Sequence, residues 1–424
     1  MMVGGAALMS VGIIDAYFVG QLGADALAAI SFIFPVTVAL SSLGVGVIAG
    51  ISSVVSRALG EGDTDKARRR GNMGIVLAGL FGLAVGLSLY AFRLPLFRLM
   101  QADEALMPLI DAYMGPFALG FPLLLLNMGA NGCIRGQGLA KRASAILVAY
   151  AAANWLLDPI LITGAFGFEG FGVAGAAYAT IGGWIVGFGA GFYFLQKSDL
   201  PFRPRVLGEC NWRDGTKAIV KVAGPAAFSN SINPIGLSVL TAFLAARAGD
   251  AAVAGFGTGG RLQSFAVVPL LGLSASIGAI VGQNWGAGEY QRVRQALLYA
   301  GAFCLAYGLA IGALLVLFRE PLGGLFTDDP QVVAAMADYL KIAAWGYGGY
   351  GVLIVANGAL NALDFAGNAL VQSLVRVLLV MVPVAWLVGD AWGANGVYVA
   401  ELAANLVGGS LAAAMIWWVV LRRR

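Results

Sequence analysis

Long apolar runs alternate with short polar or glycine- and proline-containing breaks along the whole chain. Each run holds roughly 20 residues or more, which is enough for one helix to cross the hydrocarbon core of a bilayer. Lipid offers the backbone no hydrogen-bond partner, so runs of this kind are expected to be helical. The pattern predicts twelve transmembrane helices, with polar residues between them. We expect them at residues 1–20, 27–56, 72–92, 106–132, 143–164, 171–196, 217–246, 251–282, 295–317, 332–360, 367–389 and 395–421.

Composition supports the membrane assignment and excludes several classes of protein. Of the 424 residues, 59% are hydrophobic and 11% are charged, whereas soluble domains carry roughly 25% charged residues. The chain has no histidine, which excludes imidazole-based catalysis and histidine metal sites. Cys133, Cys210 and Cys304 show no metal or redox spacing. We therefore expect no enzyme activity, no cofactor and no nucleic-acid partner.

Lysine and arginine are unevenly divided between alternate loops. Most of the 26 basic residues fall in loops on one side, among them the connection 197–216, a loop to which Arg376 is assigned, and the terminal Arg422–Arg424. The positive-inside rule places this side, with both termini, in the cytoplasm. The expected protein is a multi-pass protein of the cell inner (plasma) membrane, with 197–216 as a cytoplasmic linker.

The two halves of the chain repeat one another. At an offset of 226 residues, Ala130-Asn-Gly132 falls on Ala356-Asn-Gly358. Further on the register slips by two residues, where Gly172-Val173 meets Gly396-Val397. A nearly gapless register of this length indicates that both halves share one fold.

This repeat predicts the architecture. An even number of helices in each half keeps both halves in the same orientation, which is a parallel repeat about an axis along the membrane normal. We expect an all-α integral membrane protein of twelve transmembrane helices in two six-helix lobes, 1–196 and 217–424, related by a pseudo-twofold axis. Rocking of two such lobes is typical of alternating-access transporters. The seventh helix starts earlier in the repeat than the first, so a natural N-terminus extending before Met1 is also expected.

The halves differ in their acidic residues. Asp15 lies inside the first predicted helix, and its counterpart is Thr241. Asn154 and Asp158 lie on one face of the fifth helix, and their counterparts within 378–384 are apolar. A carboxylate inside a membrane bundle is costly and is a functional candidate by default. Two carboxylates with an amide form an oxygen site suited to Na⁺ or H⁺, although each aspartate is also explained as a helix cap or anchor.

Other intramembrane polar residues allow two interpretations. Asn230 and Asn233 lie in a Ser/Asn cluster of the seventh helix and either line a cleft or join helices by hydrogen bonds. Glu401 and Arg261, near the starts of their helices, are equally well explained as interfacial side chains.

Three motifs resemble one known family. Gly12-Ile-Ile-Asp15-Ala-Tyr-Phe-Val-Gly20 resembles the first helix of multidrug and toxic compound extrusion (MATE) transporters. Gly282-Gln-Asn-Trp-Gly286-Ala-Gly288 resembles the motif that follows the eighth helix in this family. Asn154-x-x-x-Asp158-Pro159 resembles the fifth-helix motif of its prokaryotic DinF-like branch. The likeness extends in order over essentially the whole chain.

This resemblance implies a function and a site. The implied function is secondary active multidrug efflux, an antiport that exports organic cations or amphipathic compounds in exchange for H⁺ or Na⁺. The coupling ion would bind at Asp15, Asn154, Asp158 and Thr180. Substrate is expected at Tyr17, Tyr178, Asn230 and Asn233. Membrane lipids are the other expected partners, and the protein is expected to be a monomer. The alternative is a lipid or lipid-linked oligosaccharide flippase of the same superfamily, which needs a basic patch for phosphate.

Overall fold

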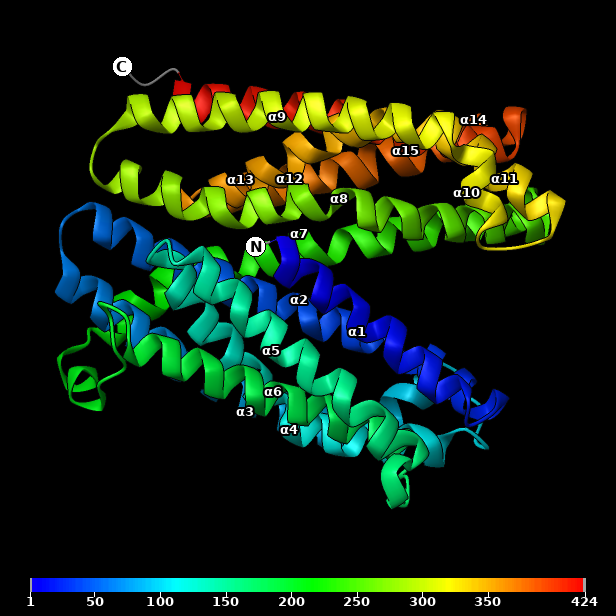
Figure 1. Ribbon diagram of the computed structural model, residues 1–424. Coiled ribbons are helices and arrows are strands. Elements are labelled where there is room, and N and C mark those ends of the chain that lie inside the picture. Colours follow the sequence, from blue (N-terminus) through cyan, green and yellow to red (C-terminus); the bar gives the residue numbers. More distant parts are fainter. Residues whose placement is uncertain (1, 422–424) are drawn as a thin grey trace. The chain divides into compact units, whose positions relative to one another are not determined.

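The computed structural model describes residues 2–421 of an almost wholly helical chain (Figure 1). Met1 and the basic terminus Arg422–Arg424 lie outside the described residues. The helices of the first half are α1 (Met2–Gly20), α2 (Ala24–Gly60), α3 (Thr64–Leu99), α4 (Met107–Gly136), α5 (Ala140–Asp158) and α6 (Val173–Gln196). A π-helical turn η1 (Pro159–Thr163) and a 3₁₀ turn η2 (Ala165–Gly167) follow α5, and a 3₁₀ turn η3 (Pro204–Glu209) follows α6.

The second half is more interrupted. Its long helices are α7 (Trp212–Arg247), α8 (Gly249–Gly286), α9 (Tyr290–Leu317) and α15 (Ala394–Ile416). The shorter pieces are α10 (Arg319–Gly324), α11 (Pro330–Ala343), η4 (Ala344–Gly346), α12 (Tyr347–Ala362), α13 (Ala366–Leu374), η5 (Val375–Met381), α14 (Val382–Trp392) and η6 (Trp417–Leu421).

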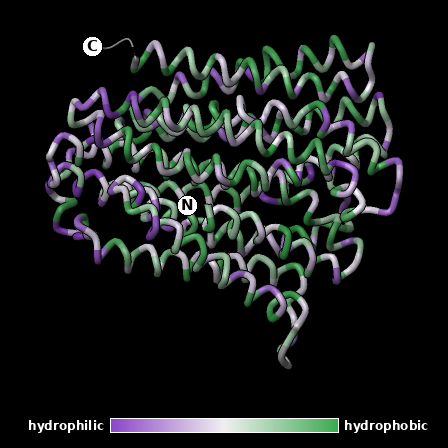
Figure 2. The backbone as a smooth tube through the Cα atoms, turned by 45° about the horizontal axis from the view of Figure 1, so that its top comes forward, coloured by the Kyte–Doolittle hydropathy of each residue, from purple (hydrophilic) through white to green (hydrophobic). Residues whose placement is uncertain are grey.

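The predicted membrane spans are present in the structure. Within residues 2–421, eleven helices are long and apolar enough to cross a bilayer. The remaining predicted span is formed by α11 and α12, which the 3₁₀ turn η4 separates. Figure 2 shows hydrophobic residues along the helices and hydrophilic residues concentrated near their ends. The prediction of an all-α protein with twelve transmembrane helices is thus confirmed.

The chain forms two compact units that divide between Ala227 and Phe228, inside α7. In the first unit, α4 packs against α2, α3 and α6, and in the second, α12 packs against α8, α9 and α15. The same helices of the repeat therefore occupy the centre of each unit. The lobe boundaries at 196 and 217 and the pseudo-twofold axis stay predictions.

The end of the repeat differs from the sequence alignment. Gly172 begins α6 with φ 59° and ψ −134°, and Gly393 begins α15 with φ 56° and ψ −132°. A side chain on Gly175 would collide with the Leu161 carbonyl, and one on Gly396 with the Val388 carbonyl. In both pairs, Gly172 with Gly393 and Gly175 with Gly396, the residue numbers differ by 221. The offset of 226 between the earlier helices is therefore reduced by five residues here, rather than by two. A loop shortened before Gly393 causes the difference.

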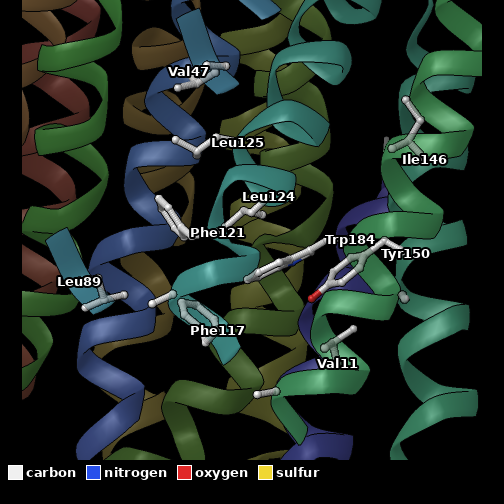
Figure 3. Packing of buried hydrophobic residues seen from close by; sticks show 14 of the residues in the cluster. Val11, Val47, Leu89, Phe117, Phe121, Leu124, Leu125, Ile146, Tyr150 and Trp184 are labelled. Atoms are coloured by element: carbon white, nitrogen blue, oxygen red, sulfur yellow. The ribbon is translucent and has the colours of Figure 1, made fainter. Parts of the chain in front are cut away.

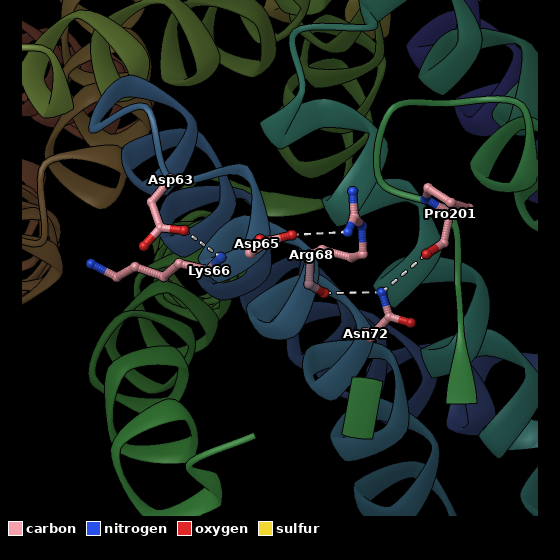
Figure 4. A network of polar contacts seen from close by, with 6 residues as sticks. All are labelled: Asp63, Asp65, Lys66, Arg68, Asn72 and Pro201. Atoms are coloured by element: carbon pink, nitrogen blue, oxygen red, sulfur yellow. Dashed lines mark hydrogen bonds and ion pairs between the residues drawn. The ribbon is translucent and has the colours of Figure 1, made fainter. Parts of the chain in front are cut away.

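The connection after α6 is attached to the start of α3 (Figure 4). Asp63 caps α3, because its carboxylate accepts from the Lys66 amide at 2.7 Å. The buried Asn72 amide donates to the Pro201 carbonyl at 3.3 Å and accepts from the Arg203 amide at 2.6 Å. One side chain therefore fixes the linker on the first unit.

Replacement of Asn72 by Leu should loosen this linker. Leu keeps the volume but leaves the Arg203 amide without its partner, which costs about 1–3 kcal/mol. We expect faster tryptic cleavage after the exposed Arg205 of the same connection, because the bond after Arg203 precedes Pro204 and resists trypsin, and a lower midpoint of thermal unfolding. Asp65→Ala is the control, because Asp65 is exposed and its ion pair with Arg68 contributes only about 0–1 kcal/mol. Equal cleavage of N72L and wild type would contradict the assignment.

Candidate functional site

The predicted coupling residues lie on three helices of the first unit. Asp15 is on α1, Asn154 and Asp158 are one turn apart on α5, and Thr180 is on α6. The helix α5 packs against both α1 and α6. After Asp158 the α-helix gives way to the π-turn η1, because Pro159 supplies no backbone N–H to the helix. The sequence thus places the acid where the regular backbone ends.

These side chains gather inside the unit. Asn154 and Asp158 are fully buried, and Thr180 is 6% exposed. Asp15 is half-buried, with its Oδ1 atom shielded from solvent, and its carboxylate interacts with the side chains of Asp158 and Asn154. The structure therefore brings the two predicted acids and the amide together.

The polar atoms of this cluster lack ordinary hydrogen bonds. Among the described residues, the buried atoms without a partner include Asp15 Oδ1, Asn154 Oδ1 and Nδ2, Asp158 Oδ1 and Oδ2, and Thr180 Oγ1. Buried polar atoms are normally paired, because an unpaired one costs free energy. Carboxylate, amide and hydroxyl oxygens are the ligands of a hard cation, and the carboxylates also accept protons. The residues present fit a bound Na⁺ or H⁺.

Aromatic side chains enclose the cluster. Tyr113 on α4 and Tyr150 on α5 are each 8% exposed, and both lie close enough to Asp15 and Asp158 to sense their charges. Trp184 packs edge-on against Phe117 with ring centroids 5.1 Å apart, and Figure 3 shows Tyr150 beside Trp184. Such aromatic neighbours lower the local dielectric and strengthen electrostatic interactions beside them.

The sequence did not single out Tyr113 and Tyr150 as site residues. Neither is charged, and tyrosine on an apolar helix usually means core packing. The available signal for Tyr113 was its match to Tyr339 at the offset of 226 residues.

The predicted substrate residues are placed but not joined into one site. Tyr17 and Tyr178 belong to the first unit and are 65% and 43% exposed. Asn230 and Asn233 lie on α7 in the second unit, where Asn230 is exposed and Asn233 half-buried. Substrate binding by these four residues stays a prediction.

A divalent-metal site is not among the features of the described chain. Within residues 2–421, no three Asp, Glu, Cys or His side chains gather in a way that could hold a metal ion. The cluster at Asp15 has two carboxylates and neutral oxygens, which suits a monovalent ion.

Two charged residues of the second unit are more deeply buried than the sequence indicated. Arg376 was assigned to a cytoplasmic loop, but it lies in the π-helical segment η5 and is 3% exposed. Its guanidinium donates to Asn405 Oδ1 at 2.7 and 3.1 Å and to Asn233 Oδ1 at 2.6 Å. The side-chain amide oxygens of two asparagines thus replace water around the guanidinium. The assignment of Arg376 to a loop was wrong.

Glu401 was open to an interfacial interpretation, which is also wrong. It is fully buried on α15 and bonded to Gln263 and Tyr339. The positions that match Asp15, Asn154 and Asp158 are indeed not acidic, and Thr241 donates to the Leu237 carbonyl of its own helix. The second unit nevertheless holds an acid of its own, at another place.

Comparison with known proteins agrees with the fold. Two bundles of apolar helices with buried ionisable groups define an integral membrane transporter. The family model MatE matches residues 1–160 and 225–387. The chain therefore belongs to the MATE family of transporters.

Individual relatives extend over almost the full length. The chain is 35% identical over 395 residues to a Shewanella oneidensis protein named FAD transporter, covering 93% of this chain and 87% of that one. It is 27% identical to the Bacillus subtilis probable multidrug resistance protein YpnP, with coverages of 94% and 88%. A mutant of the Vibrio cholerae MATE transporter VcmN has a similar structure, with a TM-score of 0.94, 28% identity, and coverages of 100% and 95%.

Proposed function

We propose that this protein is a secondary active antiporter that exports amphipathic organic compounds, organic cations among them, in exchange for H⁺ or Na⁺. The proposal rests on one observation above all, the cluster of buried and unpaired oxygens at Asp15, Asn154, Asp158 and Thr180. Its setting is the multi-pass fold in the plasma membrane, with both termini in the cytoplasm and the lobes 1–196 and 217–424 rocking about the linker.

The cluster suggests how an ion drives transport. Two carboxylates close together in a low-dielectric interior repel each other, and one bound proton or Na⁺ relieves that repulsion. An ion therefore binds more tightly to the arrangement that keeps α1, α5 and α6 together. A ligand shifts a conformational equilibrium only through such differential affinity. Neutralised carboxylates also hold a cationic substrate less strongly, so ion entry favours its release.

A flavin nucleotide is a second candidate substrate. The observation that favours it is the 35% identity to the Shewanella oneidensis protein named FAD transporter. Such a substrate is anionic, so the charge of the preferred substrate separates the two candidates. The lipid flippase stays the alternative, because it needs an accessible basic patch: Arg376 is only 3% exposed and does not supply one, whereas Arg261 on α8 is exposed.

A gradient-swap experiment tests this function. Purified protein in liposomes is given either a pH gradient or a Na⁺ gradient, with ethidium or FAD as the probe. We expect one gradient to drive uphill movement of one probe and the other gradient to drive none. Equal downhill leakage under every gradient would contradict an antiporter and indicate a passive pore.

A further inference from the structure

Polar contacts join Glu401 to two side chains of the second unit. Glu401 lies on α15, Gln263 on α8 and Tyr339 on α11. Glu401 and Tyr339 are fully buried, and Gln263 is 7% exposed. Gln263 Nε2 donates to Glu401 Oε1 at 2.7 Å. The Tyr339 hydroxyl lies 3.2 Å from Glu401 Oε2 and 3.3 Å from Gln263 Oε1.

The number of hydrogens in this ring favours a protonated Glu401. Three separate two-centre hydrogen bonds need three hydrogens, whereas a Gln263 N–H and the Tyr339 O–H supply two. With an ionised Glu401, the single tyrosine hydrogen is shared between Glu401 Oε2 and Gln263 Oε1, at the long distances of 3.2 and 3.3 Å, or serves one of them and leaves the other contact between two acceptors. With a proton on Glu401 Oε2, the acid donates to Tyr339, Tyr339 donates to Gln263, and Gln263 donates to the acid. Every contact is then a hydrogen bond.

The result does not depend on how the Gln263 amide is oriented. Oxygen and nitrogen of an amide are assigned from the surrounding hydrogen bonds. In the reversed orientation Gln263 Nε2 donates to Tyr339, Tyr339 donates to Glu401 Oε2, and Gln263 Oε1 faces Glu401 Oε1. The contact between these two oxygens again favours a proton on the acid.

We propose that Glu401 is a proton-binding site in the second unit, and that it gives up its proton during the transport cycle. This step rests on the proposed antiport function, whereas the protonation of Glu401 itself does not. Glu401 is the proton-binding group, and Gln263 and Tyr339 are positioning residues that complete the ring.

The repeat supports a functional position for the ring. At the corrected offset of 221, Thr180 corresponds to Glu401, and at 226, Tyr113 corresponds to Tyr339. Thr180 and Tyr113 are neighbours in the first unit, as Glu401 and Tyr339 are in the second. The second unit thus places its acid where the first unit places a hydroxyl of the candidate ion site.

The surroundings can also tolerate the ionised acid. The titratable or charged groups facing Glu401 are Tyr339 on α11, Tyr347 and Tyr350 on α12, Arg376 on η5, and Tyr398 on α15. Arg376 is the one cation among these described groups; it lies close enough to interact electrostatically with Glu401, and it donates to Asn405, one turn further along α15. Release of the proton creates a charge that Arg376 can balance.

Arg376 also connects the ring to α7. Its Nη1 atom donates to Asn233, whose Nδ2 atom donates to the Tyr350 hydroxyl at 2.7 Å. A new charge on Glu401 attracts Arg376 and weakens its bond to Asn233, which is a predicted substrate contact. The protonation state of the buried Glu401 is thereby linked to the half-buried Asn233.

Infrared spectroscopy tests the protonation directly. Glu401→Gln preserves the ring, because the new amide donates to Tyr339 and accepts from Gln263, so the variant should fold. In lipid at neutral pH, the wild-type minus E401Q difference should contain the carbonyl stretch of an un-ionised carboxylic acid. The control Glu320→Gln changes an exposed carboxylate of the same unit and should remove only carboxylate bands. A carboxylate band alone at Glu401 would overturn the proposal.

The number of protons exchanged per substrate molecule tests whether Glu401 releases its proton during transport. The pH gradient that just stops net substrate flux gives the number of protons exchanged, and E401Q should exchange one fewer than wild type. An unchanged number, including zero for both proteins, would overturn release of the proton. The infrared measurement requires no transport, so failure of the antiport hypothesis and failure of Glu401 protonation are separate results.

Discussion

Replacement of Asp158 by Asn is expected to lower ion-driven efflux by roughly 100-fold, the upper part of the range for coupling between two ligands. Asp158 is fully buried and both of its carboxylate oxygens lack partners. Asn keeps the size of the side chain but removes the charge that attracts the ion. The measurement is probe efflux from proteoliposomes under the active gradient, with the amount of folded protein checked by size-exclusion chromatography.

A matched control separates the site from acids in general. Asp25 is an exposed aspartate in the first turn of α2, in the same unit. Asp25→Asn should retain wild-type efflux, and Asp15→Asn should fail as Asp158→Asn does. Wild-type efflux by either D15N or D158N would contradict the site.

Replacement of Gly409 by Val is expected to destabilise the second unit by about 1–3 kcal/mol or more, the usual cost of overpacking. A Cβ atom on Gly409 would lie 2.6 Å from the Gly349 carbonyl oxygen and 2.7 Å from its Cα. Both atoms belong to the backbone of α12, so no side chain can move aside. The helices α12 and α15 would have to separate, which also disturbs the segment that carries Glu401.

The control for this variant is another helix glycine of the same unit. Gly301 on α9 has no heavy atom within 4 Å of the position a Cβ would take. Gly301→Val should therefore change the thermal unfolding midpoint little, beyond the modest helix-propensity effect of valine. Similar midpoints for the two variants would contradict the close packing of α12 on α15.

The sequence predicted the spans well because the bilayer imposes a length and a polarity on every helix. The second predicted span, 27–56, lies within α2, Ala24–Gly60. The third predicted span was 72–92, but α3 extends from Thr64 to Leu99, because charged residues continue the helix beyond the apolar core. Hydropathy detects only the part of a helix that lipid requires to be apolar.

Asp15, Asn154 and Asp158 were predictable because an acid in the centre of an apolar run has few explanations. Glu401 was ambiguous, because it lies only about two turns after the glycine that begins its helix. Its burial depends on packing by α8 and α11, which are distant in sequence. Arg376 lies inside the predicted span 367–389 but was counted with the cytoplasmic loops, because basic residues usually mark that side and the π-helical segment around it has no clear sequence signature.

The register error has a physical origin too. Gly172-Val173 and Gly396-Val397 match in sequence. The residue with positive φ that precedes the last helix of each half is, however, Gly172 in the first half and Gly393 in the second. Residue identity alone favoured the wrong glycine. The corrected register is what reveals that Glu401 occupies the position of Thr180.

The central claim, that the driving ion binds among Asp15, Asn154, Asp158 and Thr180, is tested most directly by ion binding to the purified protein. Calorimetric titration with Na⁺ at constant pH, together with proton release measured on raising the pH, identifies the bound ion in wild type. The account predicts that Asp158→Asn abolishes the Na⁺ binding or, where the bound ion is a proton, lowers the number of protons released by at least one, and that Asp25→Asn leaves both unchanged. Undiminished ion binding by D158N would contradict the account.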